Sequence, residues 1–288
     1  MTLDDFIVFI MCHENPEKIK TLIALERYGY TGKWKIVLDD QDSCIEEYKN
    51  KYGADNILIF NKEEVAKTID EMRTNADRRC IVYARNKCFD FAKELGYKYF
   101  IELDEDFIEF QFRYRLGDKL KLVYPVNLDD AFIAAVEYLA NTPSITSIAF
   151  SQGGDHIGGI NGNYKKKLLR KCMNSFICDV DRRFQFNGTT NEDVNTYCLE
   201  GSRGKVFLTY VDLMVNQTDT QTANVGITDL YRQEGTYQKS FFTVMCCPSF
   251  VKVSMMGDNH YRIHHNIDWE HAVPKIISSK YKKEKDVC

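Results

Sequence analysis

The chain has 288 residues, of which 44% are hydrophobic and 28% charged, and its net charge is −4. A chain of this length and composition can bury a substantial core, which predicts a globular α/β protein and excludes a disordered one. The near balance of charge excludes a global field that attracts nucleic acid or anionic lipid, so such a partner would need a local basic patch.

The first apolar stretch runs from Phe6 to Cys12 and has no basic segment before it, so it does not resemble a signal peptide. No window approaches the ~18 consecutive apolar residues of a membrane span, and no membrane partner is expected. The ten cysteines are scattered without a CxxC pair, which predicts free thiols in a reducing compartment. We therefore expect a cytoplasmic protein.

Strands and helices alternate in the first part of the chain. Strands are predicted at residues 6–11, 35–38, 56–60 and 97–103, and helices at 17–28, 43–51 and 84–95. The strands are continuous apolar runs, which indicates that both of their faces are covered. This alternation is typical of a mostly parallel sheet with helices on its faces.

The pattern changes after residue 106. A hairpin is predicted with strands at 107–115 and 120–126, followed by a helix at 128–139 and a strand at 145–150. Residues 151–260 carry weak signals that suggest a binding region built from loops. The last segment, 263–282, is predicted to be a final helix with a lysine-rich end.

An acid triplet, Asp104-Glu105-Asp106, follows the fourth predicted strand directly. It lies at the carboxyl edge of the sheet, where open α/β folds bind their ligands. Carboxylates are the ligands that Mg²⁺ and Mn²⁺ prefer, and such an ion can bridge them to both phosphates of a nucleotide diphosphate. Acids at strand ends also commonly cap the next element. We expect Asp104 and Asp106 to bind a metal, with Asp104 and Glu105 beside the diphosphate.

Two further positions could serve the same ligand. Asp39 and Asp40 end the second strand on the same edge, where they could accept hydrogen bonds from a nucleotide base or ribose, or form a solvated turn. Arg85 lies near the start of a predicted helix, where its charge and the helix dipole could stabilise a phosphate. A surface arginine at a helix start is equally ordinary.

A second acid pair, Glu192-Asp193, precedes a predicted helix, with Thr190 or Asn191 as its cap. In an inverting sugar transfer, a carboxylate takes the proton of the acceptor hydroxyl, and either acid could do so. An ordinary interaction with the helix dipole is the simpler alternative.

Gly153 and Gly154 lie in a glycine-rich loop after a strand, which could cover a donor sugar or be a plain turn.

Two clusters of other residue types stand out. Lys165-Lys166-Lys167, with Arg170 and Lys171, could contact nucleic-acid phosphates, although most charge runs are solvated surfaces. The adjacent His264 and His265 should point apart on a regular element, so one of them could complete the coordination of the metal.

Taken together, these residues resemble the GT-A glycosyltransferases. More narrowly, the chain is similar to the glycosyltransferases associated with TET/JBP oxygenases, which include base J glucosyltransferases and bacteriophage enzymes that glycosylate hydroxymethylated bases. The resemblance rests on the stretches at residues 84–87 with 99–106, 191–197, 235–241, and 262–265 with 273–276.

The resemblance implies an α/β GT-A fold in a single domain spanning 1–288, with a nucleotide-sugar-binding half (1–106) and an acceptor-binding half (107–288). It implies Mn²⁺ or Mg²⁺ at Asp104 and Asp106 with His264 or His265, and Asp193 or Glu192 as the base. The implied donor is UDP-glucose or a related UDP-sugar. The implied acceptor is hydroxymethylcytosine or hydroxymethyluracil in DNA, in the host cytoplasm if the protein is phage-encoded. The acidic chain departs from this pattern, although flipping the base out, at roughly a few kcal/mol, would let a local groove suffice.

Three alternatives remain at this stage. A cytosolic GT-A enzyme acting on a polysaccharide, a lipid-linked sugar or a protein would share the donor site. A sugar nucleotidyltransferase would also share the sheet, but the segment from Cys12 to Pro16 lacks the glycine-rich basic loop that usually follows its first strand. Carboxylate-rich strand ends argue against a non-catalytic nucleic-acid-binding module, because carboxylates repel phosphate unless a metal intervenes.

Overall fold

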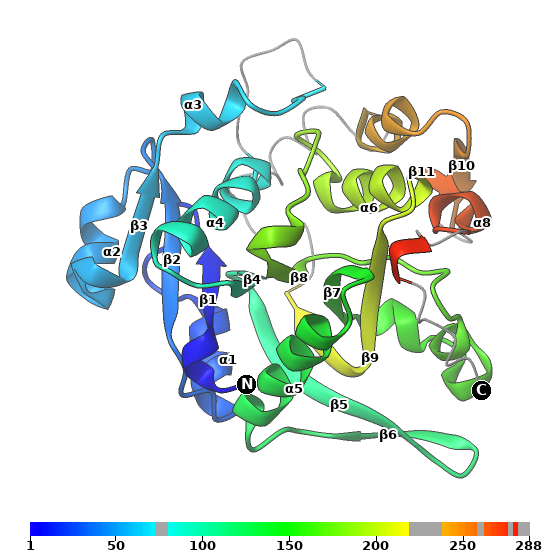
Figure 1. Ribbon diagram of the computed structural model, residues 1–288, viewed down its shortest axis with the longest axis horizontal. Coiled ribbons are helices and arrows are strands. Elements are labelled where there is room, and N and C mark those ends of the chain that lie inside the picture. The colour runs from blue at the N-terminus through cyan, green and yellow to red at the C-terminus, as the bar shows by residue number, and fades with distance from the viewer. Residues whose placement is uncertain (73–79, 219–237, 258–261, 276–278, 282–288) are drawn as a thin grey trace.

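A computed structural model describes residues 1–72, 80–218, 238–257, 262–275 and 279–281. Its centre is a nine-stranded sheet in the order β3-β2-β1-β4-β8-β7-β9-β5-β6, and a two-stranded sheet, β10-β11, stands apart from it. Figure 1 shows the helices arranged around the large sheet, with the β5–β6 hairpin extending away from the centre.

The first part of the chain follows the predicted alternation. Its elements are β1 (Phe6–Met11), α1 (Lys20–Arg27), β2 (Trp34–Asp39), α2 (Ile45–Tyr52), β3 (Ile57–Phe60), α3 (Lys62–Ala66), α4 (Val82–Glu94) and β4 (Tyr99–Asp104). Only the short helix α3 was not foreseen.

The second part contains more strand than the sequence indicated. Its elements are β5 (Phe107–Leu116), β6 (Lys119–Val123), α5 (Leu128–Asn141), β7 (Ile145–Ser151), β8 (Ser175–Asp179), α6 (Glu192–Ser202), β9 (Val206–Gln217), β10 (Val251–Met256), β11 (Arg262–Ile267) and α8 (Trp269–Ala272). Residues 238–246 are also helical. Three short 3₁₀ turns, η3 (Gly153–His156), η4 (Gly159–Asn161) and η5 (Asn163–Lys165), form the loop after β7.

Seven strands of the large sheet run in one direction, and β8 and β5 run in the other. This follows from the pairings, because β4–β8, β8–β7, β9–β5 and β5–β6 are antiparallel whereas the other neighbours are parallel. The expected class, an α/β fold with a mostly parallel mixed sheet flanked by helices, is confirmed.

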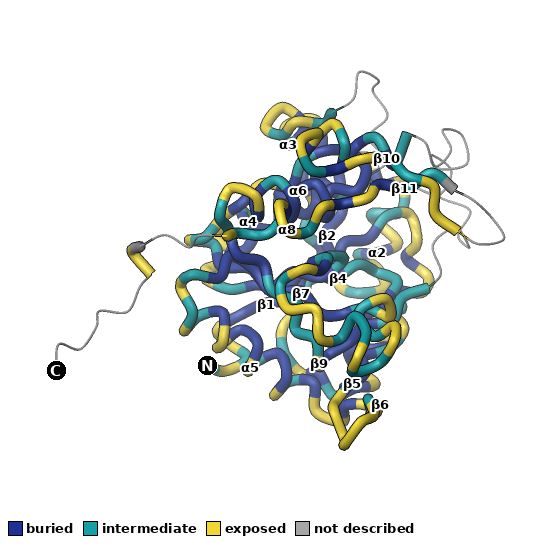
Figure 2. Tube along the Cα trace, turned by 90° about the vertical axis from the view of Figure 1, so that its right-hand side faces the viewer, coloured by how far each residue is buried: buried dark blue, intermediate teal, exposed yellow. Residues whose placement is uncertain are grey.

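Alternate side chains of β1 divide the core into two layers. Phe6, Val8 and Ile10 pack with α1, α2 and α5 on one face of the sheet. Ile7 and Phe9 pack with α4, α6 and residues 242–247 on the other. All of β1 is buried, as its continuous apolar run predicted. Figure 2 shows this buried interior inside an exposed rim.

The candidate site lies where the strand order reverses. β2 and β4 flank β1 in parallel, so Asp39 and Asp104 end their strands at the same edge, beside Met11 at the end of β1. The chain continues from β1 to one side of the sheet and later returns on the other. Such a switch point leaves a crevice outside the carboxyl ends of the strands.

The prediction of a final helix over 263–282 was wrong. Residues 262–267 form β11, which pairs antiparallel with β10, and the helix α8 that follows is only four residues long. The physical reason is a period of two: His265 and Ile267 are buried while Asn266 between them is exposed.

Two other expectations concern the whole chain. The nine cysteines that the structure describes are free, as predicted. No helix within the described ranges is long and apolar enough to cross a membrane.

Candidate functional site

The acid triplet occupies the tight connection between β4 and β5. Thr21, a fully buried residue of α1, fixes its backbone by three hydrogen bonds. The Thr21 hydroxyl donates to the Asp104 carbonyl and accepts from the Phe107 amide, and the Thr21 amide donates to the Glu105 carbonyl. The connection is therefore held rigidly against the first helix. Nothing in the sequence around Thr21 indicated this role.

Arg85 forms the centre of a buried ion-pair cluster beneath the triplet. Its Nη2 donates to Asp104 Oδ1 at 2.8 Å, and its Nε donates to Glu192 Oε1 at 3.1 Å. Its Nη1 lies 3.6 Å from Glu102 Oε2, and its guanidinium lies over the rings of Phe176 and Phe186. Only 1% of Arg85 is exposed. It is thus buried among carboxylates. The prediction that Arg85 contacts a phosphate directly had assumed an open position at the helix start, which the structure does not show.

The charges of this cluster do not balance, because one guanidinium faces three carboxylates. Burial, partly offset by Arg85, raises the pKa of Glu102 to about 8 and that of Asp104 to about 7. Burial lowers the pKa of Arg85, but Asp104, Glu192 and Glu102 outweigh it and raise that pKa overall. A further cation beside Asp104 would therefore be stabilised.

The other two acids of the triplet are also crowded. Burial raises the pKa of Glu105 to about 8, and one of its carboxylate oxygens, Oε2, is buried without a hydrogen-bond partner in the described structure. Burial also raises the pKa of Asp106, against a hydrogen bond that Thr218 donates to its Oδ2 at 3.0 Å. Neither acid simply caps the next element.

Asp39 and Asp40, at the end of β2, have different surroundings. Asp39 is buried and pairs with the equally buried Lys62 at 2.9 Å, and His13 Nδ1 lies 3.7 Å from it. Asp40 instead accepts hydrogen bonds from the Lys62 amide and the Asn61 side chain at the start of α3. Both carboxylates are therefore engaged, because the Gln41 amide also donates to Asp39 Oδ1 at 3.0 Å, but Asp39 is buried whereas Asp40 is exposed.

A third acid at this edge was not predicted. Asp42 is buried, accepts from the Glu14 amide at 2.8 Å and lies 3.7 Å from His13 Nδ1. Its signal in the sequence, one more acid after Asp39-Asp40, is too weak to separate from a turn.

The pair Glu192-Asp193 begins α6 and is buried, so the expected position of the helix start is confirmed. Asn191 occupies the cap position with a left-handed backbone (φ 56°), but its side chain donates to the Lys239 carbonyl instead of capping α6. Burial and Asp193 raise the pKa of Glu192, against Arg85. Asp193 Oδ1 accepts from the Val194 amide at 2.7 Å. Both acids thus lie in the protein interior, unlike ordinary surface residues at a helix start.

The two histidines differ from expectation in their relation to each other. Their ring centroids lie 4.2 Å apart, although neighbouring residues of a strand should point to opposite faces. His265 is buried with its Nδ1 3.5 Å from the side-chain nitrogen Nδ2 of Asn191, and its Nε2 has no hydrogen-bond partner in the described structure. His265 therefore lies at the start of α6, beside the second acid pair.

The two glycines predicted to approach a donor sugar lie on the open surface of their loop. A side-chain carbon added to Gly153 or Gly154 would meet nothing within 4 Å. The neighbouring basic cluster is divided by the structure. Lys165, Lys166 and Lys167 are exposed, but Arg170 is buried and donates to the carbonyls of 163, 164, 166 and 167. Arg170 thus organises the loop, and its assignment to a phosphate-binding patch was wrong.

The carboxylates suit a hard divalent cation. Within the described part of the chain, no group of three or more His, Cys, Asp or Glu side chains is arranged to hold a metal. Mg²⁺ and Mn²⁺ at nucleotide sites, however, are commonly held by one or two carboxylates together with phosphate oxygens and water. Asp104 and Asp106 provide two such carboxylates, and Oε2 of the neighbouring Glu105 has no hydrogen-bond partner in the described structure.

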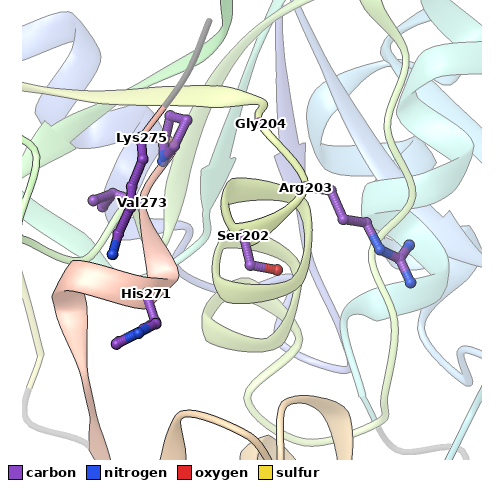
Figure 3. Close-up of a pocket in the computed structure, with 7 residues that line it drawn as sticks. Ser202, Arg203, Gly204, His271, Val273 and Lys275 are labelled. Atoms are coloured by element: carbon purple, nitrogen blue, oxygen red, sulfur yellow. The ribbon is translucent and has the colours of Figure 1, made fainter.

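A separate cavity of about 380 Å³ lies between the end of α6 and the segment around α8. Figure 3 shows that Arg203 points away from His271 and Lys275, so these three side chains do not converge. This cavity is lined by none of the acids described above.

The family comparison decides the class of the protein. The sequence model of the TET-associated glycosyltransferases matches residues 6–226. The chain belongs to this family. It is therefore a glycosyltransferase, and the expected GT-A class agrees with its sheet. Of the resembling stretches, residues 235–237 and 276 lie outside the described residues.

The chain is also similar to solved structures of glucosyl-3-phosphoglycerate synthase from Mycobacterium tuberculosis. The complex with Mg²⁺ and UDP has a TM-score of 0.46 and 9% identity, covering 91% of this chain and 87% of that one. The complex with Mn²⁺ and UDP-glucose has a TM-score of 0.45 and 9% identity, covering 90% and 85%. No curated protein matches the chain in sequence.

Proposed function

We propose that this glycosyltransferase uses a divalent cation and a UDP-sugar, and transfers the sugar to the hydroxyl of a 5-hydroxymethylpyrimidine in DNA. The observation that carries the proposal is the buried cluster in which Arg85 pairs with both Asp104 and Glu192. It ties the metal-type carboxylate at the end of β4 to the acid pair at the start of α6. In the proposal, Arg85 therefore holds both a metal-binding carboxylate of the donor site and the helix start that carries the candidate base.

Asp104 and Asp106 would hold Mn²⁺ or Mg²⁺ in this proposal. When bound, the ion supplies Lewis-acid stabilisation of the diphosphate leaving group. His265 is the better candidate of the two histidines for a further contact, because its buried Nε2 lacks a partner in the described structure. In the proposal Asp39, at the same edge, accepts a hydrogen bond from the base or ribose of the nucleotide.

Asp193 is the better candidate for the base. Arg85 Nε holds Glu192 Oε1 at 3.1 Å in a buried ion pair, so this carboxylate is engaged in supporting the cluster. Asp193 Oδ1 instead accepts a hydrogen bond from the backbone amide of its neighbour Val194. In the proposal Asp193 removes the proton of the acceptor hydroxyl, while Glu192 and Arg85 hold the start of α6 in place.

The acceptor is proposed from the family rather than from the site. Association with TET oxygenases, which gives the family its name, favours a hydroxymethylated base, and enzymes of this type in bacteriophages would act on phage DNA. The exposed lysines 165–167 would supply part of the phosphate contact. The cytoplasmic location and the division of the chain at residue 106 stay predictions.

Calorimetry with UDP, with and without Mn²⁺, tests the donor site. We expect Mn²⁺-dependent binding of UDP by the wild type and its loss in Asp106→Asn. Asp129→Asn is the matched control, because Asp129 is an acid of α5 outside the site whose side chain accepts hydrogen bonds from the Thr31 amide and hydroxyl. Binding of UDP that does not depend on the metal, or that survives in Asp106→Asn, would contradict the proposal.

A further inference from the structure

The β5–β6 hairpin is an exposed arm whose composition differs from the rest of the protein. Leu116, Val123 and Tyr124 are exposed by 58%, 48% and 47%. Figure 1 shows the hairpin extending from the centre of the molecule to its rim, and Figure 2 shows its tip fully exposed. Gly117 makes the turn with a positive φ of 61°.

The arm is locally basic in an acidic protein. Between residues 111 and 123 there are four basic residues (Arg113, Arg115, Lys119 and Lys121) and one acid, which gives a local charge of +3 against −4 for the whole chain. Lys119 and Lys121 are exposed, and neither has a carboxylate partner among the residues that the structure describes. Their charges are therefore available to a polyanion.

The register of the hairpin combines these lysines with an aromatic ring. Tyr114 stands opposite Lys121, and Leu116 stands opposite Lys119. Because side chains alternate across a strand, Tyr114, Leu116, Lys119 and Lys121 share one face of the ribbon. The two arginines lie on the other face. Basic residues interleaved with an exposed aromatic ring are typical of nucleic-acid-binding surfaces.

The arm is directly connected to the candidate site. β5 begins at Phe107, immediately after Asp106, and its ten residues span roughly 33 Å at the usual rise of a strand. Double-stranded DNA of that length is about ten base pairs and carries one charge per ~1.7 Å. β6 also contacts η4, which leads into the exposed lysines 165–167. The arm and the loop that carries these lysines are thus neighbours.

We propose that the β5–β6 hairpin is a docking arm for nucleic acid, in which Lys119 and Lys121 contact phosphates along the duplex flanking the modified base. The inference rests on the proposed function for the identity of its ligand as DNA. A second copy of the chain fits this face less well, because a symmetric contact would bring two hairpins of charge +3 together.

Fluorescence anisotropy with a duplex of twenty base pairs, unmodified or hydroxymethylated, tests the arm over a range of salt concentrations. We expect Lys119→Ala/Lys121→Ala to bind both duplexes about tenfold more weakly, with a salt slope smaller by about two. Lys119→Arg/Lys121→Arg should restore binding. The matched control is Lys67→Ala/Lys93→Ala, which removes two exposed lysines far from the hairpin in sequence. Unchanged affinity and slope in the hairpin variant would overturn the proposal.

Two further results separate this inference from the proposed function. If the wild type binds DNA through the arm but transfers no sugar to hydroxymethylated duplex, the proposed acceptor fails and the arm stands. If the hairpin variant transfers sugar to that duplex with an unchanged KM, the arm fails and the proposed function stands. Sedimentation covers the other occupant: a wild-type dimer that becomes a monomer in Tyr114→Ala/Leu116→Ala would assign the face to a second copy and overturn the inference.

Discussion

Arg85 Nε lies 3.1 Å from Glu192 Oε1, across 107 positions of sequence. The same guanidinium pairs with Asp104 at 2.8 Å, so one buried cation joins the end of β4 to the start of α6. The acid triplet after β4 and the acid pair of α6 are thereby joined in a single cluster.

Replacing Arg85 with Ala should destabilise the protein by about 3–5 kcal/mol, because it leaves buried carboxylates without their cation. Denaturant unfolding measures the change. The matched control is Lys98→Ala, which breaks the largely exposed pair with Asp181 and should cost at most about 1 kcal/mol. Equal effects of the two variants would show that Arg85 does not hold the cluster together.

Stability without metal should fall as pH rises. Glu102 and Asp104 have ordinary pKa values of 4.5 and 3.8, and burial raises them to about 8 and about 7. Folding therefore favours their protonated forms: the stability they contribute is complete below about pH 4 and is lost as pH rises through 7 to 8. Unfolding free energies measured from pH 4 to 9 check this slope.

The same titration with a divalent cation provides the comparison. Mn²⁺ binds ionised carboxylates, so it should restore stability at the alkaline end and leave the acid end unchanged. Glu102→Gln should reduce the metal-free slope, because a neutral amide replaces one of the titrating groups. A wild-type stability that rises from pH 5 to 8 without metal would contradict the assignment.

His265 should act in the opposite direction. Burial, with Lys171 and His264 adding to it, lowers its pKa from 6.5 to about 3, so the folded protein keeps this imidazole neutral. Its stabilising contribution is present above about pH 6.5 and is lost as pH falls towards 3. NMR of the imidazole resonances should show no titration of His265 between pH 5 and 8. A midpoint near 6.5 would show that the ring is open to water.

Gly201→Ala should destabilise the protein although alanine normally favours a helix over glycine. Gly201 lies in α6, and an added side-chain carbon would come within 2.3 Å of the Ala272 carbonyl oxygen in α8. The expected loss is about 1–3 kcal/mol by overpacking. Gly154→Ala, where nothing lies within 4 Å, should change stability by less than about 0.5 kcal/mol. A stabilised Gly201→Ala would mean that α8 does not pack on α6 as described.

Local patterns were sufficient to predict the first half of the fold. Continuous apolar runs and glycine stops located β1 to β4 and α1, α2 and α4, and the strand ends placed Asp39 and Asp104 at one edge. The second half was predicted less completely. β9 is a largely apolar run interrupted by Thr209 and Asp212, so a strand signal was present there, but the weak patterns around it led to a prediction of loops.

The chemical types of the site residues were also predictable, but their partners were not. Arg85 appears in sequence as a cation near a helix start, and only the packing of α4 against β4 and α6 turns it into a buried counter-ion. Arg170 follows the lysine run in the sequence, yet its guanidinium donates hydrogen bonds to backbone carbonyls of its own loop. Thr21 carries no local signal at all, because its function depends on a turn 83 positions away.

The most direct test of the central claim is mass spectrometry of hydroxymethylated DNA after incubation with a panel of UDP-sugars and Mn²⁺. The wild type should add one hexose or pentose mass to the hydroxymethylpyrimidine with one of these donors. Asp106→Asn and Asp193→Asn should lose the product, and Glu192→Gln should retain more of it than Asp193→Asn. If no donor adds a sugar to the hydroxymethylated DNA under conditions in which UDP binds with Mn²⁺, the proposed acceptor is contradicted. If Asp106→Asn forms product at the wild-type rate, the proposed site is contradicted.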